Sequence, residues 1–329
     1  MESSSPALCI CVYGAGAIGG SLAARLAHAG AQVAIVARGV HARAIAERGL
    51  TLLSGEQEIQ VRVPCVDPAH CDGLFDGVFV AVKSASLPAL APQLGRMLKP
   101  NGRLVFAMNG LPWWFPDGLL MPQSATLAQA LDPGGLMRRH VDLRQVVGCV
   151  VNSSSEVIAP GVILNSTPQR NRLILGRPDG LEDPQLEAIA ALLRSAGYEA
   201  PSTPSIREAL WHKMLLAVAA GPVAALTGSD LGRLAGDADV LALMVQIMQE
   251  GALMGRQLGL QVPGDALDRL LFFRGLTTRP SLLQDFEAGR TPEIDNSILA
   301  FSLIAGLLKV PSPALNLVAG LIRVKRQAA

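Results

Sequence analysis

The residues of this chain that are best suited to chemistry are a glycine-rich turn, an arginine after a strand and a lysine on an apolar helix face. The turn follows the apolar run 9–13 and consists of Gly14, Ala15, Gly16, Ala17, Ile18 and Gly19. In a Gly-x-Gly-x-x-Gly turn, glycines let the backbone approach a pyrophosphate at the positive end of the next helix. The turn therefore predicts a dinucleotide site; the alternative is an ordinary tight strand-to-helix turn.

Arg38 follows the second predicted strand, 32–37, and bears on which dinucleotide binds. NAD sites usually place a carboxylate near this point to hold the ribose 2′-hydroxyl, and the segment 33–38 contains none. An Asp or Glu would repel a 2′-phosphate, whereas an arginine guanidinium can bind it through two hydrogen bonds. We therefore expect NADP rather than NAD. The alternative for Arg38 is a solvated residue beside a helix start.

Lys83 and Asn109 come directly after two further predicted strands, 77–82 and 103–108. Ligands of an open α/β sheet bind beyond the carboxyl ends of its strands. Both residues are therefore expected at the same sheet edge as the glycine turn. Each also has a simpler interpretation, Lys83 as a surface residue and Asn109-Gly110 as a turn.

Lys213 is the most informative residue of the second half. On a helix begun at Ser205 it shares one face with apolar or small residues, namely Ile206, Leu210, Ala217 and Gly221. Lysine is seldom buried without cause, and a partly desolvated ammonium loses its proton more readily, so it can serve as a general acid. The alternative is a lysine at the edge of the face that keeps its charge in water.

Glu293 lies in the segment 290–295, where Thr291-Pro292 predicts the start of a helix. Glu293 and Asp295 would then lie in the first helical turn, where the helix dipole stabilises a carboxylate. This explanation accounts for Glu293 without any catalytic or binding role, so the local sequence alone does not assign it one.

No metal site is predicted. Potential ligands cluster in one short segment and consist of Cys65, Asp67, His70, Cys71 and Asp72. A structural zinc site of this kind needs a second paired motif, and the chain shows none.

The composition excludes several classes of function. The formal net charge is +1 over 329 residues, so we expect no nucleic-acid partner. Five cysteines, an odd number, indicate small core side chains of a reduced, cytoplasmic protein. The N-terminus lacks the pattern of a signal peptide. The longest apolar stretch, 214–226, is too short for a membrane span and contains Gly221-Pro222, so no membrane association is expected.

The predicted elements divide the chain into an α/β half and a helical half. Strands at 7–13, 32–37, 77–82 and 103–108 alternate with helices at 17–30, 41–48 and 87–98, which predicts a parallel sheet with right-handed crossovers. The same half contains a hairpin at 50–63, short strands at 146–151, 156–164 and 172–175, and a helix at 184–196 capped by Asp183. Beyond Ser205 we expect helices, with capping boxes at Ser205 and Ser281. The fold class is thus a Rossmann-type parallel-sheet domain over 1–202 followed by an all-helical domain over 203–329.

These residues resemble the ketopantoate reductase (2-dehydropantoate 2-reductase) family over nearly the whole chain. The resemblance rests on the glycine turn, Arg38, Val82-Lys83, Asn109-Gly110, Glu156 with Pro160-Gly161, Trp211-His212-Lys213 and the string 281–295. That last string, SLLQDFEAGRTPEID, is the most specific. The resemblance implies an N-terminal Rossmann domain, a helical C-terminal domain and a cleft between them.

The resemblance also implies roles by position. The glycine turn would hold the pyrophosphate of NADPH and Arg38 its 2′-phosphate, with Lys83 and Asn109 along the cofactor and substrate. On the other half of the site, the implied general acid is Lys213. Ser281 would hold the substrate carboxylate and Glu293 would contact substrate or cofactor. The implied reaction is hydride transfer to the 2-oxo carbon of 2-dehydropantoate, a step of pantothenate biosynthesis, with Lys213 protonating the oxygen.

Two departures from the family pattern bear on the substrate. The family's lysine helix typically carries asparagines four and eight residues beyond the lysine, where this chain has Ala217 and Gly221. Two tryptophans, Trp113-Trp114, also follow Asn109 and would make a larger, more apolar pocket wall. The substrate is therefore 2-dehydropantoate or a related 2-oxo acid.

Two other functions remain open at this point. One is a protein that senses NADPH without turnover, and the other is a reductase of a different carbonyl or an imine. A homodimer is also open, because the apolar helices expected near 241–258 and 297–308 could pack within the domain or across an interface.

Overall fold

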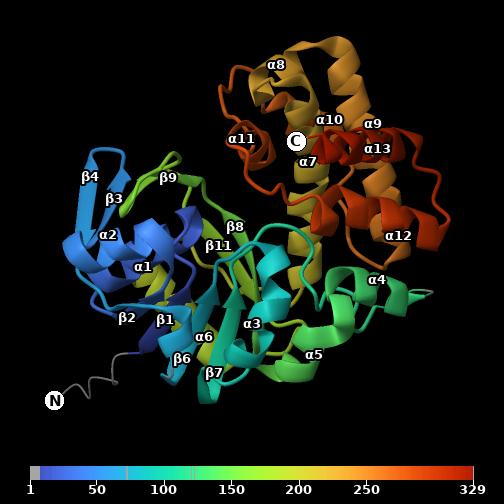
Figure 1. Cartoon of the computed structure of the whole chain (residues 1–329). Coiled ribbons are helices and arrows are strands. Elements are labelled where there is room, and N and C mark those ends of the chain that lie inside the picture. The colour runs from blue at the N-terminus through green and yellow to red at the C-terminus, as the bar shows by residue number, and fades with distance from the viewer. Residues whose placement is uncertain (1–7, 72, 120, 122, 329) are drawn as a thin grey trace. The chain divides into compact units, whose positions relative to one another are not determined.

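The computed structural model describes residues 8–71, 73–119, 121 and 123–328, and the chain folds into two compact units (Figure 1). The first unit contains the described residues up to Asn109 together with Gly135–Ile206. The second contains Gly110–Gly134 and the described residues from Arg207 onward. Each unit has its own hydrophobic core, as expected of a domain.

The first unit is built on a seven-stranded sheet with the order β11-β8-β7-β6-β1-β2-β5. Its strands are β1 (Cys9–Tyr13), β2 (Gln32–Val36), β5 (Cys65–Val66), β6 (Phe75–Val80), β7 (Leu98–Phe106), β8 (Val146–Asn152) and β11 (Arg172–Gly176). Neighbours run parallel except β11, which is antiparallel to β8. The predicted parallel sheet is confirmed. The inner strands are nearly continuous runs of apolar residues, because both faces of the sheet are covered by other elements.

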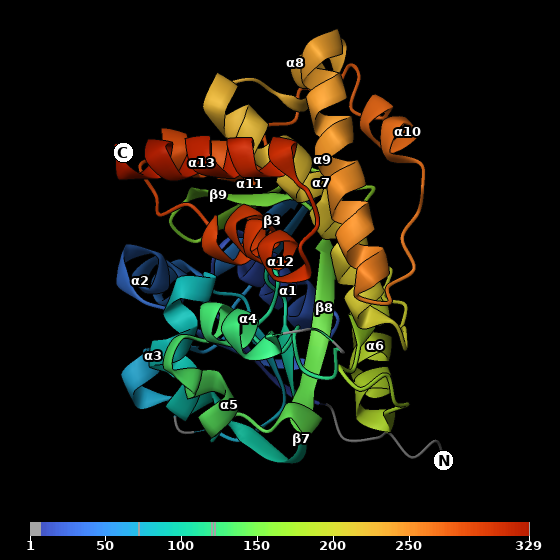
Figure 2. The ribbon, with the colours of Figure 1, turned by 90° about the vertical axis from the view of Figure 1, so that its right-hand side faces the viewer.

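Helices cover the two faces of this sheet, with α3 and α5 on one side of the strands and α6 on the other in Figure 2. The helices of the unit are α1 (Ala17–His28), α2 (Gly39–Arg48), α3 (Leu87–Leu94), α5 (Leu136–His140) and α6 (Pro184–Ser195). The predicted cap of α6 is confirmed, since the Asp183 carboxylate accepts a hydrogen bond from the Gln185 amide at 3.0 Å. A cap of this kind is worth about 1 kcal/mol.

A second, four-stranded sheet packs on α1. Its order is β4-β3-β10-β9, with β3 (Leu50–Ser54), β4 (Gln57–Val61), β9 (Ser155–Ala159) and β10 (Val162–Asn165). The predicted hairpin 50–63 is β3-β4, and β10 runs parallel to β3. The approach to α1 is close, because a Cβ added at Gly20 would lie 2.7 Å from Ile163 Cγ1. The helix that follows the glycine turn is therefore held between two sheets.

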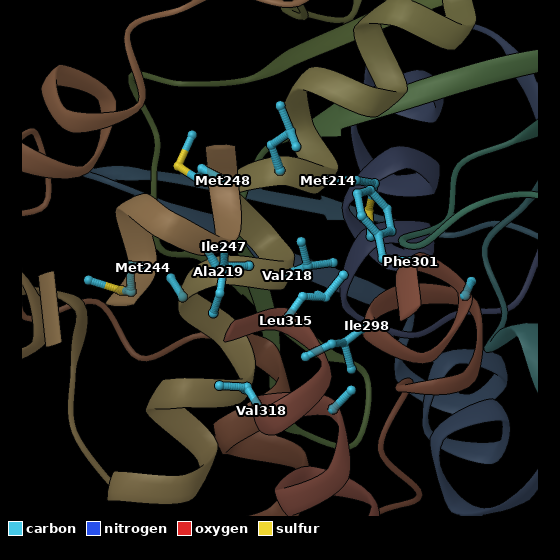
Figure 3. Close-up of a cluster of buried hydrophobic side chains, with 14 of the residues drawn as sticks. Met214, Val218, Ala219, Met244, Ile247, Met248, Ile298, Phe301, Leu315 and Val318 are labelled. Carbon is cyan, nitrogen blue, oxygen red and sulfur yellow. The ribbon is translucent and has the colours of Figure 1, made fainter. Parts of the chain in front are cut away.

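The second unit is helical. Its elements are α4 (Ser124–Leu131), α7 (Ile206–Thr227), α8 (Leu231–Gly236), α9 (Ala238–Gln257), α10 (Ala266–Leu271), α11 (Ser281–Glu287), the π-helical turn η5 (Asp295–Leu299), α12 (Ala300–Leu308) and α13 (Pro313–Gln327). The core collects side chains from several of these helices, and Figure 3 labels Met214, Val218, Met248, Phe301 and Leu315 among them. α7 is long and apolar enough to cross a membrane, but 67% of its most apolar window is buried inside the protein. The apolar side chains of α7 therefore form part of the core of the helical unit.

The segment Gly110–Gly134 belongs by its contacts to the helical unit. The chain therefore enters that unit once after Asn109, returns to the first unit at Gly135, and enters the helical unit again at Arg207. The Leu111 amide donates to the Asn296 carbonyl oxygen at 2.6 Å. Phe115 stacks on Trp211 of α7, with ring centroids 5.8 Å apart. These contacts are formed with residues more than 90 positions away, so local patterns carry no sign of them.

Two local predictions in the 281–295 string are wrong. α11 begins at Ser281 itself, with Pro280 at the N-cap and no side-chain cap bond, so Ser281 does not form a capping box. A capping residue must have non-helical backbone angles, and Ser281 is already helical. Thr291-Pro292 does not start a helix either: the Ile294 amide bonds back to the Pro292 carbonyl, and regular turns begin only at Asp295.

Candidate active site

The three glycines of the turn have different surroundings. Gly14 has φ +102°, which favours glycine, and a Cβ there would lie 2.6 Å from the Ala81 carbonyl oxygen. A Cβ at Gly19 would overlap the Gly14 carbonyl oxygen. A Cβ at Gly16 would meet nothing within 4 Å, and Gly16 is exposed. Gly14 and Gly19 thus serve the fold, whereas Gly16 faces open space that a ligand can enter.

The backbone around Gly16 suits an anion. Gly16 is the N-cap of the twelve-residue α1, with no side-chain cap bond and no acidic residue in the first turn. The first amides of a helix lack intrahelical partners and carry a partial positive charge. The turn, which continues through Ala17 and the half-buried Ile18 of α1, therefore fits a dinucleotide pyrophosphate.

A side chain that sequence reasoning did not single out fixes this turn. His41, in α2, has Nε2 2.7 Å from the Ala15 carbonyl oxygen. The Gly161 amide, in the β9–β10 turn, donates to Nδ1 of the same ring at 3.0 Å. Gly161 is 120 residues from His41, so spacing in the sequence gives no signal of this contact.

The strand ends that precede Arg38, Lys83 and Asn109 lie side by side in register. Tyr13 pairs with Val36 on one side and Val80 on the other, and Val80 pairs with Phe106. The strands are parallel, so the three chain segments leave the sheet at the edge where the glycine turn leaves it. The predicted meeting of these segments at one edge is confirmed, although their contacts with a ligand stay predictions.

Each of the three residues has a defined local setting. Arg38 is exposed and is the extended N-cap residue of α2, at φ −140° and ψ 166°. Lys83 is half-buried and precedes the short 3₁₀ turn at Ser84–Ser86. Asn109 is exposed at the end of the first unit, and the next residue, Gly110, has φ +85°.

Tyr13, beneath this edge, has a structural role. Its hydroxyl donates to Gln93 Oε1 at 2.7 Å, and Gln93 Nε2 donates to the Pro68 carbonyl oxygen at 2.6 Å. Burial raises the pKa of Tyr13 to about 12, and the charge of Arg38 partly opposes that rise. The phenol therefore stays protonated at neutral pH and holds the loop after β5 to α3.

In the helical unit, Lys213 lies on the part of α7 that is accessible to solvent. Lys213 is half-buried and Ala217, one turn later, is exposed, whereas most of α7 is buried. A Cβ added at Gly221 would make only ordinary contact, 3.9 Å from Leu282 of α11. The predicted face of Lys213, Ala217 and Gly221 therefore runs toward the start of α11, where the exposed Ser281 lies.

Glu293 precedes the π-helical turn η5. Its carbonyl oxygen accepts from the Ser297 hydroxyl at 2.7 Å, and Ser297 has non-helical angles (φ −120°, ψ −107°) inside the turn. Asp295 pairs with Arg326 of α13 through contacts of 2.8 and 2.7 Å, which explains that carboxylate structurally. π-helical turns occur often at functional sites, so Glu293, half-buried beside one, remains a candidate.

The Trp113-Trp114 pair is buried rather than exposed on a loop. The Arg207 guanidinium lies over the Trp114 ring, 5.6 Å from its centroid, and donates through Nε to the Phe115 carbonyl oxygen at 3.1 Å. Gly110 also packs against Asn296, whose side chain a Cβ at Gly110 would overlap. The segment that begins directly after Asn109 is thus packed into the helical unit.

The candidate metal ligands Cys65, Asp67, His70 and Cys71 do not come together as a group that could hold a metal ion. Among the residues that the structure describes, no group of three or more His, Cys, Asp and Glu side chains could hold a metal ion. Asp72, the last member of the 65–72 cluster, lies outside the described residues. The five cysteines are present as thiols.

Comparisons with known proteins show which family the chain belongs to. The model of the family described as ketopantoate reductase PanE/ApbA matches residues 10–177, and the model of its C-terminal part matches residues 205–326. The chain belongs to the ketopantoate reductase family. It is accordingly a 2-dehydropantoate 2-reductase-like oxidoreductase with a Rossmann-like N-terminal domain, and its family uses a nicotinamide cofactor.

The relatives agree over nearly the full length. The chain is 35% identical to a 2-dehydropantoate 2-reductase of Mesorhizobium japonicum over 95% of this chain and 96% of that protein. A protein of Ralstonia solanacearum MolK2 described provisionally as a ketopantoate reductase has a TM-score of 0.89 and 35% identity over 98% of each chain. A D-mandelate dehydrogenase solved with NADH and anilino(oxo)acetate shares the fold at 16% identity, with a TM-score of 0.84 over 98% and 99% of the chains.

Proposed function

We propose that this protein uses NADPH to reduce a 2-oxo acid to the 2-hydroxy acid. The observation that carries the proposal is the sheet edge where the glycine turn, Arg38, Lys83 and Asn109 follow strands in register. Such an edge is where open α/β sheets bind ligands. The open space at Gly16 and the bare N-terminus of α1 match the pyrophosphate.

NADP is proposed over NAD because of Arg38. The segment from the end of β2 to the start of α2, Val36–Arg38, contains no carboxylate, and the exposed guanidinium is at the N-cap of α2. An arginine in this place can bind a 2′-phosphate through two charge-assisted hydrogen bonds. A D-mandelate dehydrogenase of the same fold was solved with NADH, so the fold alone does not select NADP. The proposed preference for NADP therefore depends on Arg38.

The chain's own residues provide the rest of the chemistry. Bound NADPH supplies the hydride. Lys213 donates a proton to the 2-oxo oxygen and stabilises the negative charge that builds there. Ser281 binds the substrate carboxylate, and Glu293 contacts substrate or cofactor. Lys83 and Asn109 orient the cofactor and the substrate at the sheet edge.

The substrate is proposed to be 2-dehydropantoate or a bulkier 2-oxo acid. The bulkier class is favoured by the exposed Ala217 and by Gly221, where even an added Cβ would lie 3.9 Å from its nearest neighbour. Small side chains at these points leave room beside Lys213. The D-mandelate dehydrogenase of the same fold was solved with anilino(oxo)acetate, which carries an aromatic ring.

Steady-state turnover tests this function. Purified protein, NADPH and a panel of 2-dehydropantoate, 2-oxoisovalerate and phenylglyoxylate should show substrate-dependent loss of absorbance at 340 nm. Tight NADPH binding without turnover on any member would favour the sensor alternative. Turnover of aldehydes or imines alone would favour a reductase of another substrate class.

The assembly and cellular location follow as further proposals. We propose a homodimer, because α13 leaves Leu317, Leu321 and Val324 exposed on one face, and a dimeric ketopantoate reductase of Staphylococcus aureus shares the fold. Sedimentation velocity should give the mass of two chains. Five thiols suit the reducing cytoplasm, where we propose that the protein acts.

A further inference from the structure

We propose that His41 is a positioning residue that holds the glycine turn in its cofactor-binding shape. The inference rests on the nicotinamide cofactor binding at that turn. No charge or ligand contact is required of His41 itself. Its ring joins the turn after β1 to the turn between β9 and β10 through two hydrogen bonds.

The two bonds fix the state of the ring. A backbone amide can only donate, so Nδ1, which receives the Gly161 N–H, is the unprotonated nitrogen. A neutral imidazole carries its proton on the other nitrogen. Nε2 therefore donates to the Ala15 carbonyl oxygen, 2.7 Å away. The ring is neutral and in the Nε2–H form.

The Ala15 carbonyl is the part of the turn that needs an anchor. Gly14 on one side is fastened by its amide to the Val36 carbonyl oxygen at 2.9 Å, and Gly19 is fixed by close packing. On the other side, a Cβ added at Gly16 would meet nothing within 4 Å, and the Gly16 carbonyl oxygen is held by the Gly20 amide at 2.7 Å. The peptide that joins Ala15 to Gly16 carries the Gly16 amide opposite the Ala15 carbonyl. By holding the carbonyl, His41 aims that amide into the open space.

The far end of the link is itself rigid. Gly161 has φ +84°, a Cβ there would lie 3.4 Å from Ala44 Cβ of α2, and its carbonyl oxygen accepts from the Thr51 amide at 2.9 Å. The Arg48 guanidinium donates to the neighbouring Pro160 carbonyl oxygen at 3.3 Å on the exposed side. The second sheet, through this turn, thus supports the cofactor loop of the first.

Three variants separate the hydrogen bonds from the packing. His41→Leu fills the space but removes both bonds. His41→Gln offers an amide oxygen as acceptor and an amide N–H as donor, which matches the Nδ1 and Nε2 pair. Arg48→Ala is the matched control, because it removes an exposed bond to the same turn and leaves the ring in place.

NADPH dissociation constants from protein fluorescence, the urea midpoint without cofactor, and kcat are the readouts. We expect His41→Leu to weaken NADPH binding about 10-fold, with kcat at saturating cofactor changed less than about 2-fold because the turn is not at the reacting atoms. His41→Gln should bind within about 3-fold of wild type, and Arg48→Ala within about 2-fold. A lower urea midpoint alone, with NADPH affinity intact, would show a structural role only and overturn the inference.

Other outcomes are equally decisive. If His41→Gln bound NADPH as weakly as His41→Leu does, the hydrogen-bond explanation would be refuted. If Arg48→Ala bound NADPH as weakly as His41→Leu does, the effect would be assigned to packing of the 160–161 turn. Long-range ¹H–¹⁵N spectra of the wild type must show His41 in the Nε2–H form, a check that no misfolded variant can obscure. Wild-type protein that does not bind NADPH would instead count against the proposed cofactor.

Discussion

Replacing Gly16 by alanine should separate cofactor binding from folding. The added methyl group would meet no protein atom within 4 Å, and Gly16 has an ordinary φ of −65°. An alanine N-cap is less favourable than glycine, but the unfolded chain also loses freedom, so the two effects offset within about 1 kcal/mol. The free energy of unfolding of the cofactor-free protein should therefore barely change.

NADPH binding should change strongly in the same variant. The methyl group would occupy the space that a phosphate needs, and one charge-assisted hydrogen bond is worth about 1.5–3 kcal/mol. Since about 1.4 kcal/mol is a factor of ten, the dissociation constant should rise about 10- to 150-fold. Isothermal titration with NADPH and urea unfolding of the cofactor-free protein measure the two quantities independently.

Gly19→Ala is the contrasting control. Its Cβ would overlap the Gly14 carbonyl oxygen, so the strand and helix must move apart. We expect a loss of at least about 2 kcal/mol of unfolding free energy even without cofactor. If Gly16→Ala bound NADPH as tightly as the wild type, with unchanged stability, the space at Gly16 would not be the phosphate site and the reasoning would be refuted.

Three further predictions concern specificity and stability. Arg38→Ala should weaken NADPH about 30-fold but NADH less than about 2-fold in the same titration; equal losses would remove Arg38 from 2′-phosphate recognition. Gly221→Val should raise KM for phenylglyoxylate about 10-fold more than for pyruvate, because the side chain fills the space before Leu282. Asp183→Asn should destabilise the protein at pH 7 by about 3 kcal/mol in urea unfolding, because the half-buried Arg103 and Arg177 lose the charge of their shared, buried partner. Burial alone would raise the pKa of Asp183, but the charge and hydrogen bond of Arg103, together with hydrogen bonds from Gln185 and Arg177, outweigh it and lower the pKa below 3.8. The stabilisation is therefore complete above pH 3.8 and is lost as pH falls through the lowered pKa, so the gap to the variant must narrow in acid.

The sheet edge of the candidate site could be predicted because its signals are local. An apolar run followed by glycine, arginine, lysine or asparagine can be recognised within a few residues, and alternation with helices makes the strands parallel. Parallel strands necessarily end at the same edge. The positions of Arg38, Lys83 and Asn109 therefore followed from the sequence with no knowledge of distant contacts.

What the sequence did not predict depends on distant partners. The link from His41 to Gly161 and the pairing of β10 with β3 join residues more than 100 positions apart. A π-helical turn at Asp295–Leu299 stands in place of the helix start predicted at Thr291-Pro292, and it packs against α4, α12 and α13, which are distant in the sequence or follow it. Local propensity is too weak to decide such cases against tertiary contacts.

Single-turnover reduction by Lys213 variants tests the central claim most directly. With the protein saturated with NADPH and mixed rapidly with a 2-oxo acid that it turns over, Lys213→Met should slow the absorbance decay at 340 nm about 10²- to 10⁴-fold, while the NADPH dissociation constant stays within about 3-fold. Lys213→Arg keeps the charge but cannot release a proton, so it should remain slow. A decay in Lys213→Met as fast as in the wild type would contradict the account.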